Sequence, residues 1–126
     1  MAELTRALRT VVVLADDLIW STRLSDAITA AGARPVRARR LADLDVLLGA
    51  GGDGANLAIV DLTARTYDGL DAIRVATGTG ARVVAVGQHD DAELRRGALA
   101  AGAERVYTYR ALFENGPRTL AAWLAR

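Results

Sequence analysis

The sequence of 126 residues contains no cysteine, and all 16 of its basic residues are arginine, so lysine is absent as well. Without cysteine, neither disulfide bonds nor thiolate chemistry is available. Without lysine, the chain cannot form a Schiff base or place a compact ammonium charge in a site. A single histidine, His89, leaves no His-rich metal site and no pair of catalytic histidines. These absences exclude several large classes of enzyme before any motif is considered.

The chain also lacks a large net charge and any long apolar run. The 16 basic and 15 acidic residues give a net charge of +1, too little to attract nucleic acid or an anionic membrane. Hydrophobic residues make up 52% of the chain and charged residues 25%, a globular balance, yet no apolar stretch is of membrane-spanning length. Residues 1–6 lack the features of a signal peptide. We therefore expect one cytoplasmic domain over residues 1–126, without a nucleic-acid or membrane partner.

Short apolar runs alternate with longer amphipathic segments along the chain, a pattern typical of α/β domains with a parallel sheet. The run at residues 34–38 contains Pro35 and two arginines and is predicted to be an edge strand. We predict a flavodoxin-like, doubly wound five-stranded parallel sheet, with strand order 2-1-3-4-5 and helices on both faces. The predicted strands are residues 10–15, 34–38, 57–61, 82–86 and 104–108.

The segments between these runs carry apolar residues at helical spacing, as at Leu24, Ala27 and Ile28. The third helix is predicted to begin near Asp68, the fourth to cover residues 90–100, and the last to begin near Leu112. Glycines such as Gly102 stand where helices should end and predict left-handed caps.

Three carboxylates are predicted to meet at one edge of the sheet. Asp16 and Asp17 follow the first strand and Asp61 ends the third. Sites in open parallel sheets form outside the carboxyl ends of the strands, and carboxylates gathered there suit a hard cation such as Mg2+. The alternative is that Asp16 or Asp17 is only a helix N-cap and that Asp61 merely terminates a strand.

Three stretches of the sequence resemble the receiver domains of two-component response regulators, and the resemblance extends over nearly the whole chain. The first is the run 12–17 with its acidic pair, followed by an amphipathic helix that closes at Gly32. The second is Asp61-Leu62, followed by Asp68-Gly69-Leu70. The third is Ala101-Gly102-Ala103 before the last strand.

The resemblance implies that Asp61 is the phosphoacceptor and that Asp16, Asp17 and Asp61 hold Mg2+, although the switch residues of the family are missing. Gly87 replaces the hydroxyl residue at the end of the fourth strand, Val106 the aromatic of the fifth strand, and Tyr109 the lysine that follows it. We therefore expect a degenerate pseudo-receiver that binds Mg2+ weakly and changes conformation little on phosphorylation.

Other residues near the acidic edge have two interpretations. Arg110 could substitute for the missing lysine charge, or it is a solvated cation at a strand end. Trp20 could cover the acidic site or pack on a neighbouring loop. Tyr107, Tyr109 and Phe113 cluster near the fifth strand and the last helix, where receivers make dimer and output contacts.

The expected function is a receiver-like, non-enzymatic signalling module of a two-component system or phosphorelay that acts by protein contact. Its partner is expected to be a histidine kinase or an output protein, with a homodimer through the fifth strand and last helix as a further expectation. Two alternatives stay open. One is a functional receiver with Mg2+-dependent phosphorylation of Asp61. The other is a small phosphatase-like enzyme at the same edge, although Thr63 stands where that class has a second aspartate.

Overall fold

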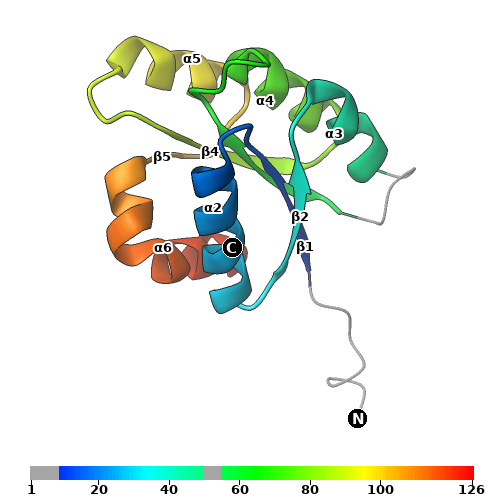
Figure 1. The fold of residues 1–126 in the computed structure, drawn as a ribbon. Coiled ribbons are helices and arrows are strands. Elements are labelled where there is room, and N and C mark those ends of the chain that lie inside the picture. Colours follow the sequence, from blue (N-terminus) through cyan, green and yellow to red (C-terminus); the bar gives the residue numbers. More distant parts are fainter. Residues whose placement is uncertain (1–8, 50–54) are drawn as a thin grey trace.

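The computed structural model describes residues 9–49 and 55–126, and its centre is a five-stranded parallel sheet (Figure 1). The strand order is β2-β1-β3-β4-β5, which confirms the predicted fold and places β2 at an edge. All four strand pairings are parallel, so the carboxyl ends of the strands lie at one edge of the sheet. The strands are β1 Thr10–Leu14, β2 Arg34–Ala38, β3 Leu57–Asp61, β4 Arg82–Gly87 and β5 Val106–Thr108.

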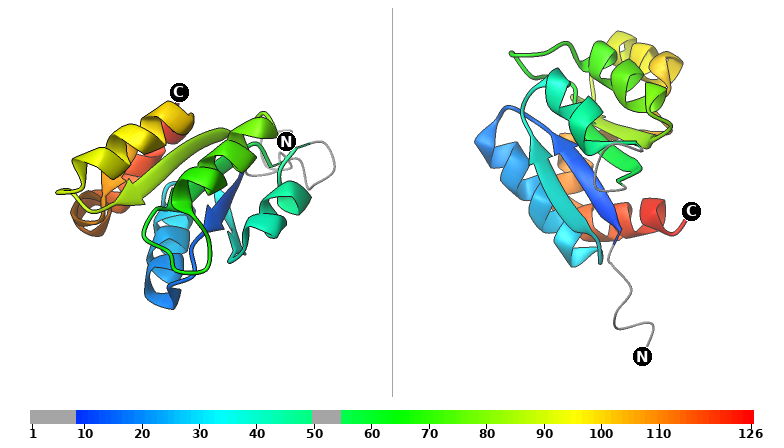
Figure 2. Two further views of the ribbon diagram at one scale, coloured as in Figure 1. Left: turned by 90° about the horizontal axis from the view of Figure 1, so that it is seen from above. Right: turned by 90° about the vertical axis from the view of Figure 1, so that its right-hand side faces the viewer.

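Helices cover both faces of the sheet, as the right-hand view of Figure 2 shows. On one face, α2 (Leu18–Ala30) packs against α6 (Tyr109–Leu124). The other face carries α3 (Leu41–Leu47), α4 (Gly69–Gly78) and α5 (Ala92–Ala101), with α4 in contact with both of its neighbours. Within the described residues, no helix combines the length and the apolar character needed to cross a membrane.

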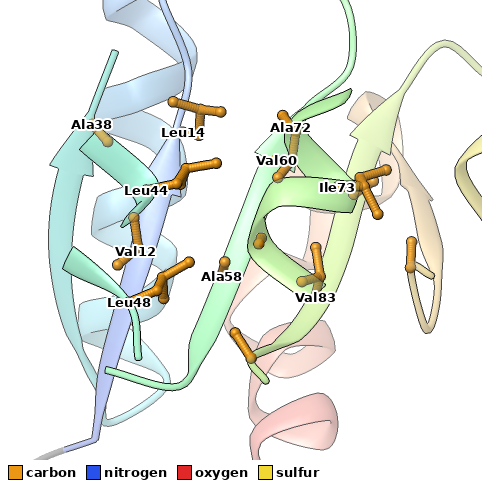
Figure 3. Close-up of a cluster of buried hydrophobic side chains, with 14 of the residues drawn as sticks. Val12, Leu14, Ala38, Leu44, Leu48, Ala58, Val60, Ala72, Ile73 and Val83 are labelled. Carbon is orange, nitrogen blue, oxygen red and sulfur yellow. The ribbon is translucent and has the colours of Figure 1, made fainter. Parts of the chain in front are cut away.

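The sheet separates two hydrophobic cores. Because side chains alternate along a strand, Val12 and Leu14 of β1 face α3 and α4 (Figure 3), whereas Val11 and Val13 face α2 and α6. All five residues of β1 and all five of β3 are buried. This double coverage explains why these strands are continuous apolar runs rather than alternating ones.

Side-chain caps set where several helices begin. Asp68 accepts a hydrogen bond from the backbone N–H of Asp71 at 3.0 Å and caps α4. This helix therefore begins where the sequence predicted, next to Asp68. Asp91 caps α5 in the same way, so that helix begins at Ala92 rather than at residue 90. Thr108 accepts from the N–H of Ala111 at 3.0 Å and starts α6 at Tyr109.

The last helix differs most from its prediction. It begins at Tyr109 rather than near Leu112, and Asn115 inside it has a non-helical backbone (φ −146°, ψ 30°). Pro117 follows shortly after. Proline has no N–H to donate and its ring clashes with the preceding turn, so the helix is kinked at this point. Smaller differences affect the strands: Ala15 lies outside β1, Gly87 extends β4, and residues 104 and 105 precede β5.

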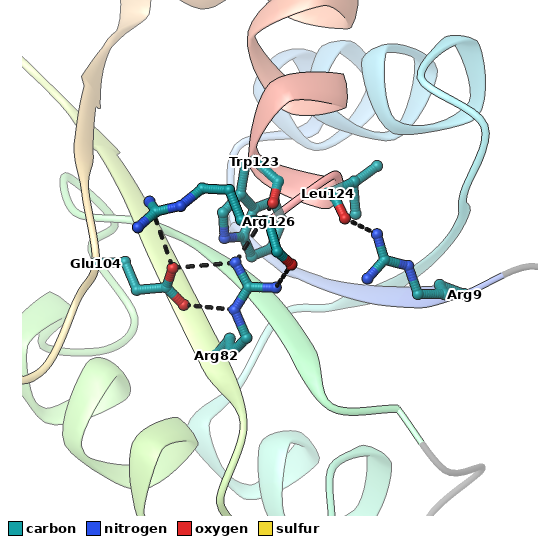
Figure 4. A network of polar contacts seen from close by, with 6 residues as sticks. All are labelled: Arg9, Arg82, Glu104, Trp123, Leu124 and Arg126. Atoms are coloured by element: carbon teal, nitrogen blue, oxygen red, sulfur yellow. Dashed lines mark hydrogen bonds and ion pairs between the residues drawn. The ribbon is translucent and has the colours of Figure 1, made fainter.

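A polar network ties β4 to the end of α6 at the amino edge of the sheet (Figure 4). Arg82 Nε donates to Glu104 Oε2 at 2.8 Å and its Nη2 donates to Glu104 Oε1 at 3.1 Å, a bidentate ion pair. The same guanidinium donates to the carbonyl oxygens of Arg126 at 3.2 Å and Trp123 at 3.3 Å. Arg9 donates to the carbonyl oxygen of Leu124. These bonds anchor the C-terminal end of α6 to the sheet.

Candidate functional site

A pocket of about 660 Å³ lies at the carboxyl edge of the sheet. It brings together the three aspartates singled out in the sequence, which come from the ends of β1 and β3, and adds Tyr109 from the start of α6. Its lining residues are Asp16, Asp17, Trp20, Arg39, Asp61, Thr63, Arg65, Thr66, Gln88 and Tyr109.

Asp61 is held at the bottom of this pocket and is only 2% exposed. Its Oδ1 accepts hydrogen bonds from the N–H of Thr63 at 3.1 Å, from the Thr63 hydroxyl at 3.2 Å and from the Tyr109 hydroxyl. Burial raises the pKa of the Asp61 carboxyl above its ordinary value of 3.8, because it outweighs the lowering effect of these hydrogen bonds. The carboxylate is therefore buried, yet satisfied by neutral donors.

Tyr109 occupies the sequence position at which the resemblance expects a lysine. Its hydroxyl contacts both the Asp61 carboxylate and the Thr63 hydroxyl, and its ring lies 4.5 Å from the ring of Trp20, centroid to centroid. Burial, followed by the hydrogen bond to Asp61, raises the pKa of the Tyr109 phenol well above its ordinary value of 10.0. The phenol therefore stays protonated at neutral pH and donates to Asp61 as a neutral group.

Asp16 holds the loop that follows β3. Its Oδ2 accepts hydrogen bonds from the N–H of Arg65 at 2.8 Å, the N–H of Thr66 at 3.0 Å and the Thr66 hydroxyl at 3.1 Å. Burial acts to raise the pKa of Asp16, but the hydrogen bonds from Thr66 and Arg65 outweigh it and lower that pKa. Asp16 is thus ionised and already engaged with the protein backbone.

Asp17 is the N-cap of α2, because its Oδ1 accepts from the N–H of Trp20 at 3.0 Å. The helix-cap alternative is therefore what the structure shows for this residue. Across residues 9–49 and 55–126, no group of three or more His, Cys, Asp or Glu side chains is arranged to hold a metal ion. Asp16, Asp17 and Asp61 share a pocket without forming a three-carboxylate cage, and Mg2+ binding stays a prediction.

Gly87, Val106 and Arg110, all within the described residues, make no hydrogen bond to the Asp61 carboxylate. A Cβ added to Gly87 would be 3.2 Å from Leu62 Cδ1, so Leu62 fills the space that a hydroxyl residue would need. Val106 is buried in the core beneath α4 and α5. Arg110 is exposed and forms an ion pair with Glu114 at 2.9 Å outside the pocket. Arg110 thus pairs with Glu114 in this structure, and its role as a substitute for the lysine charge stays a prediction.

Several residues of the site were not predicted from the sequence. Arg39 follows β2 and Arg65 follows β3, so their positions at strand ends could have indicated that both reach this pocket. Tyr67 is buried, and its hydroxyl lies 3.0 Å from the carbonyl oxygen of Leu14 and 2.7 Å from that of Asp61. No local sequence pattern predicts that the Tyr67 hydroxyl contacts the ends of both β1 and β3, because these two partners lie far from it along the chain or on another strand.

The predicted aromatic cluster is divided between different surroundings. Tyr109 and Trp20 belong to the acidic pocket, so Trp20 covers one side of the site. Phe113 is 65% exposed, and the guanidinium of Arg23 lies 4.5 Å from its ring centroid. Tyr107 is half-buried and lines a separate cavity formed by β5 and the C-terminal half of α6. The Arg23 guanidinium also lies 5.6 Å from the Trp20 ring centroid, so Arg23 links Phe113 to the pair formed by Trp20 and Tyr109, whereas Tyr107 lies in different surroundings.

No protein-family model matches the chain, and no curated protein matches it significantly in sequence. Solved structures do match. The BeF3-activated receiver domain of DrrB has a TM-score of 0.76 at 19% identity, covering 94% of this chain and 99% of that one. A response regulator from Thermotoga maritima has a TM-score of 0.76 at 16% identity, with coverage of 94% and 99%. A two-component response regulator from Clostridium difficile has a TM-score of 0.76 at 14% identity, with coverage of 94% and 97%. The chain therefore has the fold of the receiver domains of two-component response regulators.

Proposed function

We propose that this chain is a receiver-like signalling module that acts by protein contact and in which phosphorylation of Asp61 is weak or absent. The observation that carries the proposal is the hydrogen bond from the Tyr109 hydroxyl to the Asp61 carboxylate. A neutral phenol stands where the resemblance expects a lysine ammonium, and the chain contains no lysine that could replace it.

Tyrosine in place of lysine matters because phosphorylation adds negative charge beside Asp61. A phosphoryl group on Asp61 would bring several negative oxygens into a pocket that also holds the charge of Asp16. The Tyr109 hydroxyl can donate a hydrogen bond to such an oxygen, worth about 1.5–3 kcal/mol, but as a neutral group it adds no positive charge to offset the added negative charge. The bonds from Thr63 and Tyr109 all go to Oδ1 of Asp61, which leaves Oδ2 as the oxygen that would have to attack a phosphodonor.

Mg2+ binding is proposed to be weak for a related reason. Carboxylate oxygens are suitable donors, and a hydrated Mg2+ needs only one or two of them. Asp16, Asp17 and Asp61 would be the protein ligands through their second carboxylate oxygens, because one oxygen of each already accepts hydrogen bonds from the protein. Bound Mg2+ would supply a positive charge beside Asp61.

Exposed apolar side chains support an action through protein contact. Leu18 is 74% exposed and Ile19 is 64% exposed, both in the first turn of α2, and Phe113 on α6 is similarly exposed. Apolar groups exposed on neighbouring helices are common where a partner docks. We propose a histidine kinase or an output protein as the partner, and a homodimer through β5 and α6 as the second arrangement.

The proposal is tested by intact mass spectrometry after incubation with Mg2+ and acetyl phosphate. We expect the wild type to gain little phosphoryl mass, and Tyr109→Lys, which adds the missing ammonium, to gain more. The matched control is Tyr109→Phe, which removes the hydroxyl without adding charge. Asp61→Asn in the Tyr109→Lys background should abolish the gain. Extensive phosphorylation of the wild type that disappears in Asp61→Asn would favour the functional-receiver alternative.

A further inference from the structure

A second cavity, of about 330 Å³, lies between the start of β5 and the C-terminal half of α6. It shares no residue with the Asp61 pocket. Its volume is at the lower end of the range found for small-molecule sites. The residues that line it are Arg105, Tyr107, Arg118, Thr119, Ala122, Trp123 and Arg126.

Three guanidinium groups from three different segments converge on this cavity. Arg105 precedes β5, Arg118 lies within α6, and Arg126 follows the end of that helix. No acidic side chain lines the cavity among the described residues. Convergence of like charges is unfavourable in the absence of an anion, so this arrangement favours an anionic ligand.

The nearest acid is already neutralised. Glu104 forms the bidentate ion pair with Arg82 and lies 3.8 Å from Arg126, as Figure 4 shows. By contrast, the side chains of Arg105 and Arg118 make no hydrogen bond or ion pair within the described part of the chain. Two of the three guanidiniums that line the cavity are therefore available to a ligand.

Tyr107 places an aromatic ring beside these charges. Its side chain is half-buried, and burial raises the pKa of its phenol. The charges of Arg105 and Arg126 act to lower this pKa, and the charge of Glu104 acts to raise it. The cavity thus combines positive charge with an exposed part of an aromatic ring.

We propose that this cavity binds a small phosphate-bearing ligand of nucleotide size, with phosphate held by Arg105, Arg118 and Arg126 and the base against Tyr107. Guanidinium groups match phosphate oxygens in bidentate geometry, and several of them suit a multiply charged anion better than a single carboxylate. An aromatic ring at the side of the cavity suits a planar base. The proposal does not depend on the state of Asp61, since the two pockets are separate.

The test is isothermal titration calorimetry of the full chain in Mg2+-free buffer, with ADP and, separately, pyrophosphate. We expect both to bind, more weakly as salt increases. Arg105→Gln and Arg118→Gln should each lower the affinity by about tenfold, the effect of losing a hydrogen bond to a charged group. Tyr107→Leu should weaken ADP but not pyrophosphate. Arg96→Gln, an exposed arginine on α5, is the matched control and should bind as the wild type does.

Three results would contradict nucleotide binding at this cavity. Absence of measurable heat with both ligands at millimolar concentration would do so, and so would unchanged affinity in the folded Arg105→Gln and Arg118→Gln variants. Binding of pyrophosphate no tighter than sulfate at equal ionic strength would indicate a general counter-ion effect and would also overturn it. Asp61→Asn should bind ADP normally, which separates this site from the acidic pocket.

Discussion

At the scale of single residues, Tyr109 is the decisive difference between this pocket and the one that the receiver resemblance implies. A lysine ammonium would attract negative charge to Asp61, whereas a phenol satisfies the carboxylate without adding charge. The ring of Trp20 packs against Tyr109 and restricts where the hydroxyl can go. The pair therefore holds a neutral hydrogen-bond donor against Asp61.

Removal of the Tyr109 hydroxyl should affect both stability and the titration of Asp61. In Tyr109→Phe the ring contact with Trp20 is kept, but Asp61 loses a donor, so the free energy of unfolding should fall by about 1–2 kcal/mol. The pKa of Asp61 should rise further, because this hydrogen bond acts to lower it. Urea unfolding and a carboxyl NMR titration measure the two effects. Tyr107→Phe is the control, and an unchanged Asp61 pKa in Tyr109→Phe would contradict the prediction.

Asp61 and Asp16 should give stability opposite dependences on pH. The pKa of Asp61 is raised in the folded state, so its contribution is present below 3.8 and is lost as pH rises through the raised pKa. The pKa of Asp16 is lowered, so its contribution is present above 3.8 and is lost as pH falls through the lowered pKa.

Two variants separate these contributions in urea unfolding at a series of pH values. Relative to the wild type, Asp61→Asn should gain stability as the pH rises from about 4 to 7. Asp16→Asn should be less stable than the wild type at neutral pH, and this deficit should shrink on acidification. Curves that run parallel to that of the wild type would show that neither carboxyl titrates as its surroundings indicate.

At the scale of elements, the ends of helices determine much of the local geometry. Gly102, the middle residue of the sequence Ala101-Gly102-Ala103, ends α5 with φ of +120°, in the region that favours glycine. A Cβ at this position would lie 2.8 Å from Thr77 Cγ2 on α4. Glycine is therefore required here both by backbone conformation and by the approach of α4.

Two alanine substitutions at helix ends should have opposite effects. Gly102→Ala should lower the free energy of unfolding by more than about 1 kcal/mol, since it combines an unfavourable backbone conformation with a steric clash. Gly78→Ala is the matched control, because a Cβ there meets no atom within 4 Å and the residue lies in the last turn of α4. It should leave stability unchanged or raise it by up to about 1 kcal/mol. Thermal unfolding measures the stability of both variants. Equal losses of stability would show that glycine is not specifically required at position 102.

At the scale of the whole molecule, two cores on either side of one sheet hold both pockets in place. The acidic pocket lies at the carboxyl edge, and the arginine-lined cavity lies beside β5 and the later turns of α6. The positions through which a receiver would transmit a phosphoryl signal are occupied by Gly87, packed against Leu62, and by Val106, buried in the core. Neither side chain offers a polar group that could follow a phosphoryl group on Asp61.

Phosphorylation conditions should therefore change the conformation of the whole domain little. We expect amide exchange of the wild type across α5 and β5 to be the same with and without Mg2+ and acetyl phosphate, and the same in Asp61→Asn. A large increase in protection in these elements that requires Asp61 would show that the phosphoryl switch operates.

Much of the fold was predictable from the sequence because its determinants are local. Apolar runs predicted the five strands to within two residues, with β2 and β3 matching their predicted ranges, and the alternation of runs and helices predicted the strand order. Asp68 marked the start of α4 correctly. The start of α6 lies before the first apolar residue of helical spacing because Thr108 caps the helix, and the kink at Asn115 accompanies Pro117. Both signals are present in the sequence.

The sequence by itself determined that Asp16, Asp17 and Asp61 share one edge, since parallel strands end on the same side of a sheet. Only the tertiary structure decided what each carboxylate does there. Asp16 holds residues 65 and 66, and Asp61 accepts from Tyr109, which is 48 positions away along the chain. Such pairings depend on side-chain positions to within a fraction of an ångström. They are set by how α2, α6 and the loops pack on the sheet, and a linear pattern of residue types does not contain that information.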